Sequence, residues 1–500
     1  MRPYNIGPVE TGRQFPLFFP ELVHYIDATY RTIADREHRG TSGLSMGGFM
    51  SFWIAGKYPD LVSSASNFMG SSEFVVGPRE FPVEYRQDEM HDNYDGLRTR
   101  LIIGSRDFIQ FYHRRMNLIW DFTREHHESE IFDSEHSTPG MGKTLDFHMR
   151  GFASPLPRPK VWSHIDVYPE FSIWGWEVAT NRKKPGFTVI ENVSASGFRS
   201  SVRQWLPSGP VLSDVQVKIT SPALYNPGKE VVVTMVRMRD GSVHRSSQKV
   251  DSSGRLTFQL DGDEYEVGIG QGAILALTGF SIEGAPWPVD TEPVHVRARF
   301  LNKGDGVSVP VGVRWETPNA DVRLDSRTSA LPALKMGQSA EIPLTYTVQE
   351  TSREVVKLFA VAPGLRLPLE IPTFPPAPKT LDFKIANGRS LPVYQQATNI
   401  EVMTLGTGNG DGKANVGEHV AILLPDRSAY RAAELFTNDA CLDLEQRVSD
   451  NWSDYDHVGA SAKYTLALIR SSCPAGHLVR VLARVQLPDK PKSFDPLRGC

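Results

Sequence analysis

A serine between closely spaced glycines is the first feature of this sequence that could carry chemistry. Ser45 lies in the segment GLSMGG, residues 43–48, which follows a short apolar run and precedes a helical pattern. Small residues on both sides permit a tight turn that lifts a serine oxygen off the backbone. The pattern predicts that Ser45 is a nucleophile and that the amide of Met46 contributes to an oxyanion hole. A glycine-rich structural turn is the alternative.

Candidates for an acid and a base follow in the order Ser, Asp, His. Asp107 comes directly after an apolar run, and His136 lies at the start of a loop rich in Pro and Gly. His136 would take the proton of Ser45, and Asp107 would orient the imidazole and stabilise its charged form. His148 competes with His136 as the base, but it falls within a predicted helix. A turn-capping role is the alternative for Asp107.

The segments that must position these residues alternate between two periodicities. Strands are expected at residues 39–45, 61–70, 98–108 and 129–136, and helices at residues 21–34, 47–59, 111–126 and 143–152. This alternation predicts a parallel sheet with helices on its faces. The third helix ends near His126 and His127, which we expect to be exposed to solvent.

The character of the sequence changes after about residue 155. Short alternating runs such as DVQVKITS, EVVVTMVRM and PVHVRARFLNKG then recur between turn residues, which is typical of antiparallel sandwiches. The expected parts are residues 1–155, a β-rich connection at 156–285, a sandwich at 286–375 and a last sandwich at 381–500. A Pro-rich linker is expected at 371–380.

The first part resembles the putative-esterase family of α/β-hydrolases, which includes feruloyl and acetyl-xylan esterases and esterase D. The segments ELVHYIDATYRT, REHRGTSGLSMGG and KYPDLVSSASNFMG carry the resemblance, which covers about residues 15–155. It implies an α/β-hydrolase fold and hydrolysis of carboxylic esters through an acyl-serine intermediate, without a required cofactor. The substrates it implies are feruloyl, acetyl or other short acyl or aromatic esters, including esters on polysaccharide.

The same resemblance implies a second oxyanion amide on a loop after an early strand. That strand has no counterpart in MRPYNIGPV, the segment that precedes the first helix. A gene fragment or a misassigned start would explain this difference. The alternative is a shortened hydrolase whose β-domains cover the open sheet. A second function therefore stays open: a weak or inactive hydrolase scaffold in a surface or carbohydrate-binding protein.

The C-terminal β-rich parts contain two further signals. Residues 291–370 resemble adhesion-type Ig-like modules. Residues 407–418, TGNGDGKANVGE, fit a calcium loop with Asn409, Asp411 and Glu418 as ligands, although Thr407 stands where a carboxylate is expected. A turn between strands is the alternative to a structural calcium ion. No H-E-x-x-H or C-x-x-C pattern indicates a catalytic metal.

Cysteines and aromatic residues each leave two alternatives. Cys441 and Cys473 could form a disulfide within one domain or remain separate thiols, and Cys500 is the third cysteine. The aromatic side chains of residues 162–176 could form a platform for sugar or phenolic rings, or they could be a core between domains.

Composition narrows the classes of partner. The 500 residues carry a net charge of -4, so no basic field indicates nucleic-acid binding. No apolar run approaches the roughly 20 residues of a membrane helix, and residues 1–20 lack a signal-peptide core. The sandwiches favour a secreted or cell-envelope protein of a bacterium.

Overall fold

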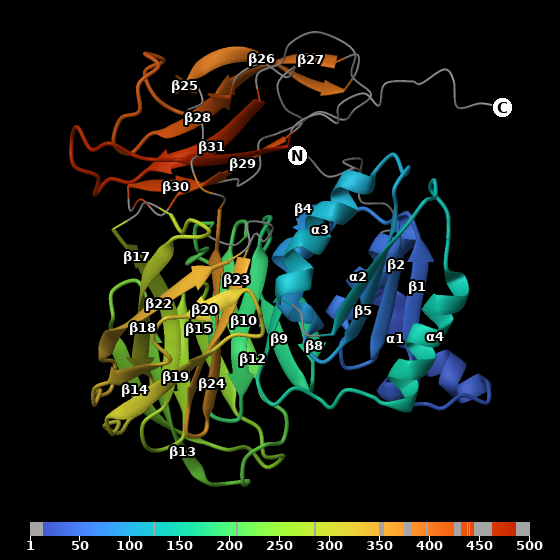
Figure 1. Cartoon of the computed structure of the whole chain (residues 1–500). Helices are drawn as coiled ribbons and strands as arrows, with labels where there is room; N and C mark the ends of the chain where they lie inside the picture. Colours follow the sequence, from blue (N-terminus) through green and yellow to red (C-terminus); the bar gives the residue numbers. More distant parts are fainter. Residues whose placement is uncertain are drawn as a thin grey trace, which may run out of the picture. The chain divides into compact units, whose positions relative to one another are not determined.

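The computed structural model describes residues 14–123, 126–206, 209–284, 287–349, 355–374, 376, 383–396, 399–424, 432–437, 439, 441–444 and 463–486. The chain divides into two compact units, Pro3–Pro376 and Ala377–Cys500 with Met1–Arg2. Figure 1 labels the elements of both units. Among the described residues, no helix combines the length and apolarity that crossing a membrane would require.

A four-stranded parallel sheet, in the order β1-β2-β5-β6, opens the larger unit. Its strands are β1 (Gly40–Leu44), β2 (Ser64–Phe68), β5 (Arg98–Gly104) and β6 (His127–Phe132), and the helices are α1 (Phe15–Thr29), α2 (Met46–Lys57), α3 (Gln110–Thr123) and α4 (Met141–Ala153). Side chains alternate across β2: Ala65 joins the core under α2 and α3, whereas Ser64 and Ser66 contact α4. Helices therefore cover both faces, and the predicted parallel sheet is present.

Helix α2 is apolar on nearly all sides because it is covered on two sides. Phe52 and Ala55 pack in the core with β5 and α3. Phe49 and Trp53 pack instead with the hairpin β3 (Glu73–Val76) and β4 (Val83–Arg86). Two layers thus hold the helix that begins directly after Ser45.

The first helix differs from its predicted span of 21–34. It begins at Phe15 because Pro16, whose fixed φ suits a first helical turn, starts it, and it ends before the extended Tyr30. Leu22 and Tyr25 are exposed, whereas Val23 is buried. Short 3-10 helices follow at Arg36–His38, Gln87–Glu89 and His91–Tyr94.

An antiparallel two-sheet sandwich follows the parallel sheet. One sheet contains β14 (Val243–Lys249), β13 (Glu230–Arg237), β16 (Tyr265–Ile269), β11 (Gly197–Arg203), β10 (Phe187–Ser194) and β7 (Trp162–Asp166), and the other contains β15 (Thr257–Asp261), β12 (Gln216–Thr220), β9 (Trp176–Thr180) and β8 (Glu170–Ile173). The two sheets share one core, in which the ring of Phe198 lies 5.8 Å from Trp176 and 5.2 Å from Phe258.

A second sandwich completes the larger unit. Its sheets are β17 (Leu275–Glu283), β18 (Pro293–Asn302), β22 (Ser339–Val348) and β20 (Val322–Leu324), facing β21 (Thr328–Leu331), β19 (Val311–Glu316), β23 (Val355–Ala362) and β24 (Leu365–Pro372). Phe300 and Trp315 lie in the shared core. Because β17 pairs with β18, this sandwich begins at Leu275, ahead of the expected boundary between residues 285 and 286.

Charged groups join the second sandwich to the parallel-sheet region. His91 Nε2 lies 2.6 Å from Glu370 Oε2, and Lys357 Nζ donates to the carbonyl of Thr123 at 2.6 Å. Burial would raise the pKa of Glu370, but the neighbouring charges of His91 and Lys357 lower it. The cluster is therefore a charged contact between two parts of the larger unit.

The smaller unit is also built of antiparallel strands. A four-stranded sheet contains β25 (Lys384–Ala386), β28 (His419–Leu424), β31 (Lys463–Ile469) and β30 (Leu442–Leu444), and two strand pairs are β26 (Arg389–Gln396) with β27 (Asn399–Leu405) and β29 (Ala432–Phe436) with β32 (Leu482–Gln486). Cys441 and Cys473 form a disulfide beside this sheet, with Cα atoms 4.9 Å apart. Cys500 lies outside the described residues.

Candidate active site

The turn between β1 and α2 presents Ser45 in a conformation that few residues other than glycine adopt. Its φ is 59° and its ψ is -122°. A Cβ on Gly43 would lie 2.2 Å from the carbonyl oxygen of Gly47, and one on Gly48 would lie 2.3 Å from Asn67 Oδ1. Only glycine fits at these two positions, so the spacing of the motif is what permits the strained turn.

Two hydrogen bonds fix this turn against its surroundings. The amide of Ser45 donates to the carbonyl of Phe68 at 2.9 Å, and its carbonyl accepts from Phe49 at 3.1 Å. Met46 is the first residue of α2, where a backbone N–H has no acceptor within the helix. The N–H of Met46 is therefore available to a developing oxyanion next to Ser45.

Asp107 and His136 come together from the ends of β5 and β6. His136 Nδ1 lies 3.0 Å from Asp107 Oδ2, and the amide of Ile109 donates to Asp107 Oδ1 at 3.0 Å. The carboxylate is fully buried, whereas about a quarter of the His136 side chain is exposed (23%). The ring of Phe108 lies 4.9 Å from that of His136. The imidazole is thus oriented through Nδ1, which leaves Nε2 for another partner.

Ser45 lies at the end of β1, and the Asp107–His136 pair follows the ends of two other strands of the same parallel sheet. Carboxyl ends of parallel strands meet at one edge of a sheet, so all three residues belong to that edge. Within the described residues, Ser45 Oγ and His136 form no hydrogen bond. Nucleophile–base distances are often longer in a free enzyme than in its complexes.

The competing histidines occupy other places. His148 on α4 lies under the opposite face of the sheet, with Nδ1 2.7 Å from Ser64 Oγ and Nε2 3.2 Å from Ser66 Oγ. Burial, with a smaller effect of the charge of Arg100, lowers the pKa of His148 to about 4. The expectation that His127 is exposed is wrong, because it begins β6 with a buried side chain bound to Thr99 Oγ1 at 3.0 Å.

Two residues near the candidate site carry no recognisable signal in the sequence. Met69 follows β2 with a φ of 52°, is fully buried, and accepts the N–H of Ser137 on its sulfur at 3.4 Å. It therefore holds the loop that bears His136. His113 on α3 is also buried, and burial lowers its pKa to about 4, although the charge of Asp107 opposes this shift.

The strand that leads to Ser45 lies at the edge of the described sheet. β1 pairs only with β2 among the described residues, and its side chains are exposed or half-buried, whereas those of β2 are all buried. The second oxyanion donor that the resemblance implies has no assigned residue here.

The predicted calcium ligands come together around an amide. Asn387 Nδ2 donates to Asn409 Oδ1, Asp411 Oδ1 and Glu418 Oε2, each at 3.1 Å. Asn387 lies well ahead of the loop in sequence, which is why the loop pattern did not reveal it. Thr407 pairs through its backbone with His419. These oxygens could hold a cation only if the Asn387 amide moved aside.

The aromatic residues of the connection are core residues. Trp162, Trp174 and Trp176 are buried in the first sandwich, and Phe171 packs against them half-buried. Tyr168 is buried with the hairpin core that contacts α2. A flat exposed platform for sugar rings is therefore not formed by these side chains.

Two comparisons bear on this region. Residues 18–145 match the family described as "Putative esterase". A solved structure of a ferulic acid esterase matches at 18% identity with a TM-score of 0.24, over 28% of this chain and 61% of that one. The family match spans the turn at Ser45, the Asp107–His136 pair and the sheet that carries them. Residues 18–145 therefore form a domain of the putative-esterase family.

Proposed function

We propose that this chain is a serine carboxylesterase in which Ser45 is the nucleophile, His136 the base and Asp107 the residue that orients the base. The observation that carries the proposal is the 3.0 Å contact of His136 Nδ1 with the buried carboxylate of Asp107. This contact selects the tautomer in which Nε2 can accept a proton from a hydroxyl group. The strained turn at Ser45 supplies that hydroxyl at the same edge of the sheet.

In the proposed reaction, His136 Nε2 takes the proton of Ser45 as the serine oxygen attacks the ester carbonyl. The N–H of Met46 donates to the oxyanion, and Asp107 stabilises the charged imidazole. His136 then returns the proton to the departing alcohol, which leaves an acyl group on Ser45. A water molecule, deprotonated by His136, releases the acid and restores the serine.

The proposed substrates are feruloyl, acetyl or other short acyl or aromatic esters, free or on polysaccharide. The resemblance in the segments around Ser45 supports this range. A structural calcium ion at Asn409, Asp411 and Glu418 and a secreted or cell-envelope location remain proposals of the same kind.

Hydrolysis of p-nitrophenyl acetate and methyl ferulate by the full chain tests the proposal. We expect Ser45→Ala to lower kcat by roughly 10⁶-fold, to the uncatalysed background if the wild-type rate is modest. Ser42→Ala is the matched control, because Ser42 lies on the same strand and its Oγ accepts a hydrogen bond from Ser66. A fluorophosphonate probe should label wild type and the control but not Ser45→Ala.

The second candidate is a weak or inactive scaffold within a surface or carbohydrate-binding protein. The edge position of β1 and the missing Ser45–His136 hydrogen bond favour it. Equal rates for wild type and Ser45→Ala, with no labelling of Ser45 by the probe, would establish this second candidate and reject the first.

A further inference from the structure

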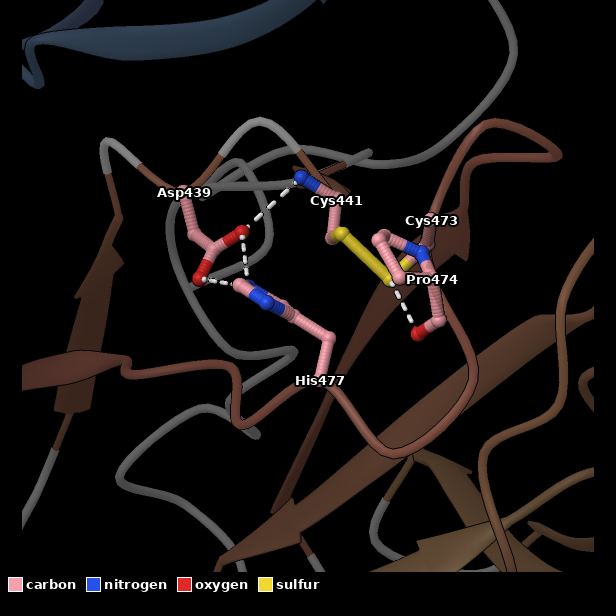
Figure 2. The surroundings of a disulfide bond; sticks show 5 residues. All are labelled: Asp439, Cys441, Cys473, Pro474 and His477. Carbon is pink, nitrogen blue, oxygen red and sulfur yellow. Dashed lines mark hydrogen bonds and ion pairs between the residues drawn. A yellow bond between two sulfur atoms is a disulfide. The ribbon is translucent and has the colours of Figure 1, made fainter.

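Two short sequence pairs meet beside the disulfide of the smaller unit. Asp439 and Cys441 come from one loop, and Cys473 and His477 come from another (Figure 2). His477 Nε2 lies 3.0 Å from Asp439 Oδ1 and 2.9 Å from Oδ2. One carboxylate oxygen, the Cys441 sulfur and one His477 nitrogen all lie within 4.8 Å of one another. Cys473 Sγ belongs to the same cluster because it is bonded to Cys441.

Backbone contacts hold these two loops independently of the sulfur–sulfur bond. The N–H of Cys441 donates to Asp439 Oδ1 at 2.9 Å. The N–H of Arg470, which follows β31, donates to the carbonyl of Cys441 at 2.9 Å, and that of Cys473 donates to Arg470 at 3.1 Å. The side chains would therefore stay close together after the disulfide is opened.

The four side chains offer a donor set that suits one metal in particular. Two thiolates, an imidazole nitrogen and a carboxylate oxygen are common ligands of tetrahedral Zn²⁺, with bonds of about 2.0–2.3 Å. Two ligand pairs from separate loops are also the usual layout of structural zinc sites. The cation that follows β31, Arg470, binds Asp443 at 2.8 Å rather than Asp439, so it does not neutralise this carboxylate.

We propose that Asp439, Cys441, Cys473 and His477 bind one Zn²⁺ when the disulfide is reduced, so that the unit has two exclusive states. A phosphine or dithiol supplies the two electrons. With a phosphine, the disulfide and one water give two thiols and a phosphine oxide. Zinc then displaces the two thiol protons and binds two thiolates, neutral His477 and the Asp439 carboxylate. All four ligands come from the protein, so the site is structural.

Burial of the ligands fits a site that is closed on one side and accessible on the other. Cys441 is buried, whereas 38% of the His477 side chain is exposed. The ion would enter past the imidazole, and the buried sulfur would be shielded from further oxidation once it is bound to zinc.

Cobalt titration of the full chain tests the proposal, because Co²⁺ in a tetrahedral thiolate site absorbs visibly and shows a sulfur charge-transfer band. The chain carries Cys500→Ser, so that only the two relevant cysteines remain, and it is reduced with a phosphine. We expect one Co²⁺ per chain with both bands, displaced by one equivalent of Zn²⁺. The oxidised chain should show neither band.

Variants separate a built site from incidental thiol binding. His477→Gln and Asp439→Asn fold with the disulfide intact before reduction, and each should weaken cobalt binding by more than about 100-fold, beyond the about 10–100-fold of outer-shell residues. Asp443→Asn is the matched control and should bind normally. Absence of the charge-transfer band in the reduced chain, or full binding by His477→Gln, would overturn the proposal.

Discussion

The two units each bring an aspartate and a histidine to about 3 Å, yet the two pairs differ in nearly everything else. Asp107 is fully buried and contacts Nδ1 of His136, whereas Asp439 is part-exposed and contacts Nε2 of His477 with both oxygens. The first pair follows two strands of a parallel sheet whose neighbouring strand ends at Ser45. The second pair lies beside two sulfur atoms.

The difference teaches that the pair alone does not define the chemistry. A carboxylate on Nδ1 leaves Nε2, the outer nitrogen of the ring, for a hydroxyl group, which suits proton transfer. A carboxylate on Nε2 places oxygen and nitrogen side by side beside the cysteines, which suits a common ion. The ring nitrogen in use and the third neighbour decide between the two.

The largest expected effect comes from breaking the buried pair. Asp107→Asn should lower kcat for p-nitrophenyl acetate by about 10⁴-fold, because an amide favours the wrong imidazole tautomer. Asp133→Asn, in the following loop, is the control, since the Asp133 side chain is 82% exposed. Steady-state rates check this expectation, and a loss of less than tenfold would mean that Asp107 is a turn residue only.

A third carboxylate–imidazole pair sharpens the comparison, since His91 and Glu370 stabilise a contact between domains. Glu370→Gln should lower the free energy of unfolding by about 3 kcal/mol, because it leaves the positive charges of His91 and Lys357 facing each other. Urea unfolding followed by tryptophan fluorescence measures the change. Glu341→Gln, which removes an exposed partner of Arg299, should change it by less than about 1 kcal/mol. Similar values for both variants would contradict a stabilising role of the buried charge.

The smallest effect concerns a histidine with no carboxylate partner. The pKa of His148 is about 4 in the folded chain, below the ordinary value of about 6.5. The unfolded chain therefore binds an extra proton between these values, and stability falls as the pH is lowered from about 6.5 to 4. His148→Gln should flatten this dependence by up to about 1.4 kcal/mol per pH unit. Unfolding curves at several pH values check this, and an unchanged slope would exclude His148 as a source.

The sequence allowed prediction of the parallel-sheet elements because their patterns are local. Ser45 stands in a motif, and the strands before Asp107 and His136 are short apolar runs with turn residues after them. Met69 could not be found in this way, because a methionine after a buried strand resembles any core residue. Asn387 and the Asp439–His477 contact were missed because their partners lie far apart in sequence and in loops without periodicity.

The edge position of β1 has a consequence for how the sheet opens. A strand with one neighbour is held by about half the backbone hydrogen bonds of a strand between two neighbours, so local unfolding begins there. Amides of β1 should exchange with deuterium sooner than those of β2 and β5, whose side chains are almost all buried. The conformational strain at Ser45 is thus located where the sheet has the least resistance to fraying.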